Sequence, residues 1–265
     1  MIKTNLMESS EIKKVVMQRG IFSVIEYERD FSVEPKMAQI SYYASKMNVR
    51  KRQLVADINY DTGIITQKGR MQLMLGDIKV TADIQNVSNL FKSIVSSKVT
   101  GETAMKPKYT GEGSVILEPS FRYILLEDLA EWTDGLIIED GMFLACCDTA
   151  EIHVEPRKTL SSAAFGGEGL FNSKITGEGI VALESPVPRS ELIEINIMDD
   201  VIKIDGNMAL AWSAGLEFTV ERTTSSLVGS VAVGEGLVNV YRGTGKVLVA
   251  PVQSNKEIPS PGNNK

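Results

Sequence analysis

The stretch Thr110-Gly-Glu-Gly-Ser-Val-Ile-Leu-Glu-Pro119 returns 66 residues later as Thr176-Gly-Glu-Gly-Ile-Val-Ala-Leu-Glu-Ser185. A weaker copy, Arg242-Gly-Thr-Gly-Lys-Val-Leu-Val-Ala-Pro251, follows after the same interval. A second marker that contains Gly-Glu precedes these stretches, beginning at Gly101, Gly167 and Gly234. Two markers that keep their order and spacing predict an internal repeat in which each copy is one structural unit.

Apolar and polar residues alternate between the markers. Ile193, Ile195 and Ile197 are separated by polar residues, and residues 216–221 follow the same period of two. This period indicates half-buried β-strands. Glycine-rich turns recur along the chain and long helical patterns are missing, which favours an antiparallel sheet structure over an α/β fold. The sequence therefore predicts an all-β protein of tandem repeated antiparallel β units.

The repeat also predicts how the chain is organised. We expect one domain over residues 1–253, with approximate units at 21–120, 121–187 and 188–253. Three similar units that bury the same face would pack around a pseudo-threefold axis. The tail 254–265 is rich in Pro and Asn, so we expect it to be disordered. The spacing of apolar residues predicts one helix within the insert at 86–97.

Composition excludes several classes of function. The 265 residues include 28 Lys and Arg against 34 Asp and Glu. The resulting net charge of −6 argues against non-specific electrostatic binding to nucleic acid or anionic lipid. No apolar run is long enough to span a bilayer, and residues 1–20 contain no signal-peptide core. The two cysteines are adjacent, which fits a reducing compartment. We therefore expect a cytoplasmic protein.

Three blocks together resemble a known family. They are Gly-Glu-Gly-Leu-Phe-Asn at 167–172, Thr-Gly-Glu-Gly at 176–179, and the Gly-containing block at 205–211. In combination they resemble the mitochondrial-biogenesis family of the "altered inheritance of mitochondria" type, over roughly residues 65–252. The resemblance implies a β-helix-like fold similar to that of the tryptophan-RNA-binding attenuator protein, in tandem copies often assembled as an oligomer. It implies no established catalytic activity.

The glycines of the markers have a predicted structural role. No marker continues as a phosphate-binding P-loop, since Gly243-Thr-Gly-Lys246 is followed by Val247. We expect these glycines to supply a positive φ or a close backbone approach at sheet corners. The residues concerned are Gly111, Gly113, Gly167, Gly169, Gly177, Gly179, Gly234, Gly236, Gly243 and Gly245. A residual hypothesis is that Glu112 and Glu178 occupy equivalent positions and bind a cation or a partner's basic side chain.

The densest basic cluster comprises Lys46, Arg50, Lys51 and Arg52. Tyrosines lie nearby, so one hypothesis is that the cluster contacts RNA phosphates while aromatic rings stack on bases. The net negative charge and the absence of the cluster from later repeats favour a solvated turn instead. Nucleic acid is not the partner that we expect.

Two further features suggest metal or redox chemistry. His153 lies between Glu151 and Glu155 on one strand face, but its equivalent in the next unit is Thr219, which favours a solvated strand face. Cys146 and Cys147 point to opposite faces if they lie in a strand, which favours packing. We predict no catalytic residue, no metal and no cofactor.

The leading hypothesis is a non-enzymatic oligomer, with a trimer favoured, that presents a scaffold or interaction surface. The alternative is a regulatory module that binds a small ligand or RNA in pockets between repeats. An enzyme of cupin type ranks last, because it needs a histidine-rich metal site and the chain has one histidine.

Overall fold

A computed structural model describes residues 2–83, 106–156, 171–205, 208–222 and 237–251. Within these ranges the chain forms sixteen β-strands, one α-helix and three short 3-10 helices. All strand pairings are antiparallel, so the predicted all-β, antiparallel class is confirmed. The predicted helix in the insert at 86–97 and the predicted tail at 254–265 lie outside the described residues.

The first sheet has nine strands in the order β1-β2-β3-β6-β4-β9-β12-β7, with β5 paired to β6. It curls into a nearly closed barrel. A hydrogen bond from the Arg19 guanidinium of β1 to the Leu126 carbonyl of β7, at 3.0 Å, links its two end strands, and the Tyr123 hydroxyl of β7 donates to the Asn48 carbonyl before β3 at 3.0 Å. Its strands are β1 (Lys13–Arg19), β2 (Phe22–Tyr27), β3 (Arg52–Ile58), β4 (Ile64–Thr66), β5 (Met71–Asp83), β6 (Lys106–Leu117), β7 (Tyr123–Asp128), β9 (Phe143–Cys147) and β12 (Ile180–Ser185).

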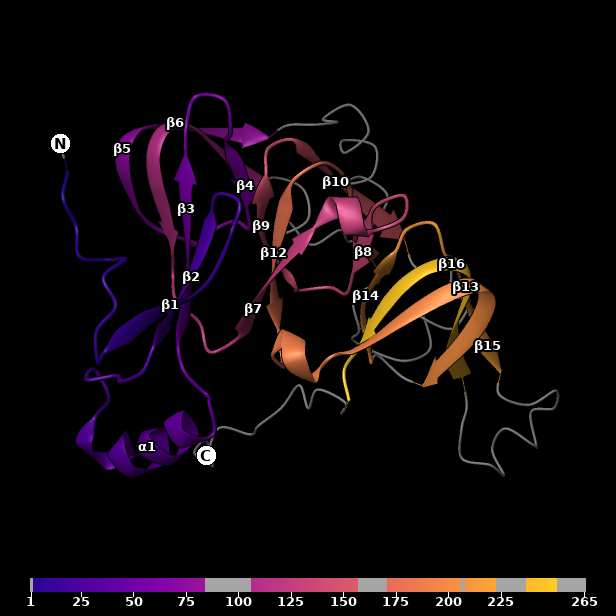
Figure 1. The fold of residues 1–265 in the computed structure, drawn as a ribbon, viewed down its shortest axis with the longest axis horizontal. Helices are drawn as coiled ribbons and strands as arrows, with labels where there is room; N and C mark the ends of the chain where they lie inside the picture. Colours follow the sequence, from indigo (N-terminus) through magenta and orange to yellow (C-terminus); the bar gives the residue numbers. More distant parts are fainter. Residues whose placement is uncertain (1, 84–105, 157–170, 206–207, 223–236, 252–265) are drawn as a thin grey trace, which may run out of the picture.

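The second sheet has seven strands in the order β10-β11-β8-β14-β16-β13, with β15 paired to β16. Figure 1 shows it beside the first sheet along the longest axis of the molecule. Its strands are β8 (Leu136–Ile138), β10 (Ala150–Pro156), β11 (Phe171–Gly177), β13 (Ile193–Asp205), β14 (Ala209–Ser213), β15 (Glu217–Arg222) and β16 (Leu237–Val249).

One hydrophobic cluster joins the two sheets. Leu125 and Val181 of the first sheet pack in it with Leu136, Ile175 and Leu248 of the second, and all five are nearly inaccessible to solvent. Burying a side chain of this size contributes about 1.5–3 kcal/mol, so the shared cluster holds the sheets together. The predicted unit boundaries and the pseudo-threefold axis stay predictions.

The first glycine of each repeated stretch lies within or at the end of a strand. Gly111 in β6, Gly177 at the end of β11 and Gly243 in β16 have φ values of 118°, 93° and 114°, a conformation that favours glycine. The backbone also approaches closely at Gly111, because a Cβ there would lie 2.0 Å from the Asp77 carbonyl oxygen. The predicted glycines at 167, 169, 234 and 236 lie outside the described residues.

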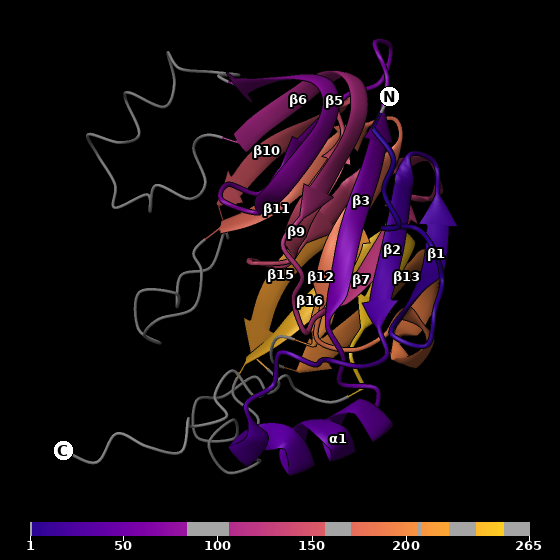
Figure 2. The ribbon, with the colours of Figure 1, turned by 90° about the vertical axis from the view of Figure 1, so that its left-hand side faces the viewer.

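The α-helix lies in the segment that connects β2 to β3. A short 3-10 turn (η1, Pro35–Met37) leads into α1 (Ala38–Lys46), and no residue of either is buried. Figures 1 and 2 both show α1 below the sheets, at the edge of the molecule. The other 3-10 turns are η2 (Leu129–Glu131) and η3 (Arg189–Glu191). Within the described ranges, no helix has the length and apolar character needed to cross a membrane.

Candidate functional site beneath the helix

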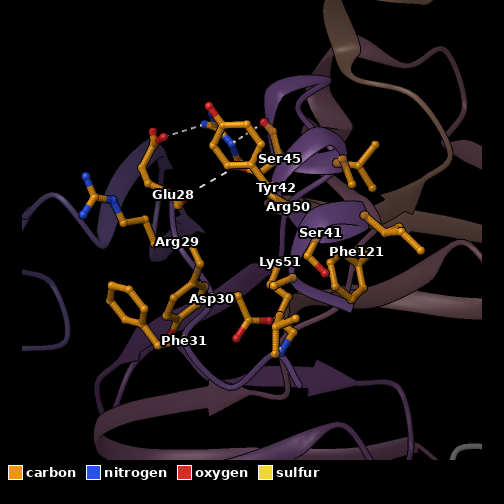
Figure 3. Close-up of a pocket in the computed structure, with 16 residues that line it drawn as sticks. Glu28, Arg29, Asp30, Phe31, Ser41, Tyr42, Ser45, Arg50, Lys51 and Phe121 are labelled. Carbon is orange, nitrogen blue, oxygen red and sulfur yellow. Dashed lines mark hydrogen bonds and ion pairs between the residues drawn. The ribbon is translucent and has the colours of Figure 1, made fainter. Parts of the chain in front are cut away.

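A pocket of about 460 Å³ lies between α1, the segment that follows β2, and residues 49–51 just before β3. Figure 3 shows side chains from all three segments around it. The apolar part of its lining includes Phe31, Val33, Ile40, Tyr42, Val49 and Phe121. The polar part includes Glu28, Asp30, Ser41, Ser45, Arg50 and Lys51. The sequence predicted pockets between repeats, whereas this pocket is formed mainly by residues 27–51.

Backbone and polar contacts hold α1 over the pocket. The helix ends just before Asn48, whose φ of 62° is left-handed and suits asparagine at this position. The Ser45 hydroxyl donates to the Glu28 carbonyl at 3.4 Å, and Arg50 Nε donates to the Ser45 carbonyl at 3.2 Å. The helix is therefore attached to the body through hydrogen bonds rather than through a buried apolar face.

An ordinary surface helix buries its large apolar side chains, whereas α1 exposes them to solvent and half-buries small ones. Ser41, Ala44 and Ser45 are half-buried and line the pocket. Ile40, Tyr43 and Met47 are spaced for one helical face and are 61%, 60% and 77% exposed, and Ile40 at the start of this row also borders the pocket. Contiguous exposed apolar side chains commonly mark an interaction site. We call Ile40, Tyr43 and Met47 the outer stripe.

The structure brings two cations of the predicted basic cluster onto one buried and one half-buried carboxylate. Arg50 Nη1 lies 2.8 Å from both Glu26 Oε1 and Glu28 Oε2. Arg52 Nη2 lies 2.6 Å from Glu26 Oε2, and the Arg52 guanidinium stacks 3.8 Å from the centre of the Tyr123 ring. Only 4% of the Arg52 side chain and 10% of the Glu26 side chain are exposed. These arginines are structural partners of acids rather than solvated cations, so the interpretation of a solvated turn is wrong for them.

The other two cations of the cluster are held differently. Lys51 Nζ lies 2.7 Å from Asp30 Oδ2 at the edge of the pocket and 5.8 Å from the centre of the Phe121 ring. Lys46, on α1, lies 5.2 Å above the Tyr42 ring and remains exposed. The four predicted residues are therefore close in space, and Lys46 is the one most open to solvent.

The ion pair at the pocket makes stability depend on pH. The Lys51 ammonium and the Ser32 groups hold the pKa of Asp30 below its ordinary value near 3.8. A lowered pKa in the folded state contributes stability above the unfolded pKa, and that contribution is lost as the pH falls through the folded pKa. We expect Asp30→Asn to cost up to about 1 kcal/mol at neutral pH and progressively less as the pH falls below 3.8, measured by urea unfolding. A cost that does not change with pH would contradict the assignment.

The two repeated glutamates stay apart in the described structure. Glu112 in β6 is exposed opposite Asp77, whereas Glu178 is exposed in the turn between β11 and β12. The backbone carbonyl of Glu178 accepts a hydrogen bond from the Thr149 hydroxyl at 2.7 Å. Among the residues that the structure describes, no group of three or more His, Cys, Asp or Glu side chains is arranged to hold a metal ion.

The histidine and the cysteines occupy contrasting positions. His153 is exposed on β10, with Nε2 3.4 Å from Glu151 Oε2 and 3.4 Å from the Thr176 hydroxyl. Cys146 packs in the cluster between the sheets, and Cys147 packs in the core of the first sheet. Burial raises the pKa of the Cys147 thiol, so the reactive thiolate is disfavoured there.

Comparison with known proteins connects this fold to a family. A model of the family described as Mitochondrial biogenesis AIM24 matches residues 47–252. The chain belongs to this family. The family that the repeated glycine blocks indicated is thereby confirmed, over a range that begins earlier than the expected residue 65.

A solved structure shows a similar fold. The crystal structure of a Streptococcus pyogenes protein aligns with a TM-score of 0.54 and 21% sequence identity. The alignment covers 77% of this chain and 89% of that chain. At this identity the similarity concerns the fold alone. A comparison with curated proteins finds no match.

The match to the AIM24 family begins after α1. Residues 47–252 contain β3 and all later strands, whereas β1, β2, α1 and most of the pocket lining precede residue 47. The pocket is therefore built mainly by a segment outside the matched region. Sequence reasoning missed it, although the spacing of Ile40, Tyr43 and Met47 was a usable signal for a helix with one apolar face.

Proposed function

We propose that this chain is a non-enzymatic interaction module, assembled as a homo-oligomer, that captures an uncharged apolar group of a protein partner in the pocket beneath α1. The observation that carries the proposal is the outer stripe beside that pocket. Large apolar side chains at 60–77% exposure remain in water unless a partner covers them. A partner that fills the pocket would also cover the neighbouring stripe.

The charges around the pocket favour an uncharged group. Arg50 is paired with Glu26 and Glu28, and Lys51 is paired with Asp30. A charged ligand would have to compete with these partners and give up its own hydration. Aromatic and aliphatic walls offer an apolar side chain the larger gain.

The same ion pairs disfavour RNA. Lysine and arginine side chains bind RNA by replacing the counterions of its phosphates, so they must be free of other partners. Three of the four predicted cations already lie against carboxylates. The proposal includes an oligomer, and the repeat favours a trimer. It also includes a reducing compartment such as the cytoplasm. Two buried cysteines that form no disulfide fit such a compartment.

A free small molecule is the second candidate occupant. The volume of about 460 Å³ lies within the range of roughly 300–1,000 Å³ that is usual for small-ligand sites. Such a ligand would have an apolar body and no net charge, for the reason given above.

The test fills the pocket without removing the helix. Ser41 faces the pocket beside Phe121 in Figure 3, so Ser41→Phe places an aromatic ring where the occupant would lie. The neutral apolar dye Nile red serves as the probe, followed by fluorescence. We expect Ser41→Phe to weaken dye binding at least tenfold, about 1.4 kcal/mol. Native mass spectrometry of gently purified wild-type protein then distinguishes a retained small molecule from an empty site that awaits a protein.

Gln39→Phe is the matched control, because it adds the same ring to an exposed position of α1 that does not line the pocket. Its dye affinity should equal that of the wild type. Equal dye binding by all three proteins would refute the pocket as a binding site.

A further inference from the structure

We propose that strand β1 of one copy of this chain pairs antiparallel with strand β13 of the next copy, so that the chains assemble head to tail. This inference rests on the proposed homo-oligomer and names its interface. The partner is a second copy of the chain, and the contact is made by two sheet edges.

Both strands are open on one side. Within the described residues, β1 pairs with β2 alone and β13 pairs with β16 alone, although at the start of β1 the Ser10 N–H donates to the Lys13 carbonyl at 2.8 Å. An open edge presents unpaired backbone N–H and C=O groups to any strand that can align with it. Figure 1 shows β1 and β13 toward opposite ends of the molecule, so one copy can use both edges at once.

The charges of the two edges are sorted by sign. β1 has the sequence KKVVMQR, with three basic residues and no acidic residue. β13 has the sequence IEINIMDDVIKID, with four acidic residues and one lysine. Opposite charges across an edge favour the pairing of unlike strands, whereas pairing of β13 with itself would bring its acids together.

One antiparallel register matches these charges along the whole of β1. Placing Lys13 opposite Asp200 puts Lys14 opposite Asp199 and Arg19 opposite Glu194. The match arises because the basic residues and the acidic residues have the same spacing in opposite chain directions. Arg19, Glu194 and Lys14 already have ion-pair partners within the chain, namely Asp128 and Glu131 for Arg19, Arg189 for Glu194 and Glu28 for Lys14. Lys13 Nζ donates a hydrogen bond to the Asn5 carbonyl at 2.8 Å. Among the described residues no cation is paired with Asp199 or Asp200, so the acidic bend of β13 carries the recognition and Lys13 exchanges a neutral partner for a charged one.

The apolar side chains agree with this register. Val15 comes opposite Met198, which is 82% exposed, and Val16 next to it is 49% exposed. The irregularity of β1 lies between Val15 and Met17, and that of β13 lies between Ile197 and Asp200. The two irregular segments therefore face each other, so the regular parts on both sides can pair.

The geometry has a consequence for assembly. The two edges belong to different surfaces, so the contact is heterologous and closes into a ring or continues as a filament. Ring closure by three copies agrees with the trimer favoured above.

The test exchanges one pair of charges. Asp200→Lys alone and Lys13→Glu alone each place like charges in contact, and we expect each to raise the dissociation constant of the oligomer at least tenfold at low salt. The double variant Lys13→Glu/Asp200→Lys restores an opposite pair and should regain most of the affinity. Analytical ultracentrifugation measures the constants, and native mass spectrometry gives the stoichiometry. Circular dichroism checks that each variant is folded.

Asp61→Lys is the matched control, since it makes the same charge change at an exposed turn of the first sheet. Its assembly should equal that of the wild type. A wild-type oligomer that all four variants leave intact would overturn the β1–β13 interface while keeping the proposed oligomer. A monomeric wild type at micromolar concentration would overturn both.

Discussion

Replacing Glu26 with glutamine is expected to lower the free energy of unfolding by about 3 kcal/mol. The Glu26 carboxylate lies within 2.8 Å of Arg50 and 2.6 Å of Arg52, and the Arg52 side chain is 4% exposed. Removing the acid leaves the Arg52 guanidinium buried without a counter-charge, which commonly costs about 3–5 kcal/mol. The Asn48 carbonyl, which accepts a hydrogen bond from Arg52 at 3.0 Å, keeps the expected value at the lower end of this range.

Urea unfolding at neutral pH measures this effect. Glu11→Gln is the control, because Glu11 is 84% exposed and faces Arg29 at 3.5 Å. Its expected cost is below about 0.5 kcal/mol. Similar unfolding midpoints for the two variants would show that Glu26 does not neutralise a buried cation.

Replacing Gly111 with alanine is expected to destabilise the protein by at least about 4 kcal/mol, a large part of the usual 5–15 kcal/mol of a folded domain. Gly111 has a φ of 118°, which side-chain-bearing residues rarely adopt. A Cβ would also lie 2.0 Å from the Asp77 carbonyl oxygen of the paired strand β5. Relief of that overlap requires β5 and β6 to separate, and this would break ladder hydrogen bonds on both sides.

Gly69→Ala separates the two causes. Gly69 has a φ of 76°, but a Cβ there would meet no heavy atom within 4 Å. The conformational cost alone, about 1 kcal/mol, is expected. Thermal unfolding of both variants gives the comparison. If they lose the same stability, the close approach of β5 to β6 contributes nothing beyond the φ preference.

The sequence predicted class and family because both depend on local signals. The period of two at Ile193, Ile195 and Ile197 reports strand structure directly, and the glycine blocks keep a regular spacing. Pairing between distant strands has no such signal. Ile64 of β4 lies opposite Cys147 of β9, and Ala211 of β14 lies opposite Ile138 of β8, because tertiary packing selects these partners.

The candidate site illustrates the same limit. The basic residues at 50–52 are adjacent in sequence, so their proximity was predictable. Their partners Glu26, Glu28 and Asp30 lie some twenty residues earlier, and α1 separates the two groups. The turn that brings them together depends on how β2 and β3 pair. A cluster of solvated cations and a neutral network of ion pairs therefore have the same sequence pattern.

The polar attachment of α1 determines how the molecule fluctuates. A helix without a buried side chain loses little hydrophobic stabilisation when it opens, so it can detach while the barrel beneath it remains folded. Its amide protons should exchange with solvent far faster than those of β3, although the two segments are neighbours in sequence. Capture of a partner would then slow exchange in α1 specifically. Recognition at this end of the molecule would be coupled to the ordering of a single helix, with the sheets acting as a fixed support.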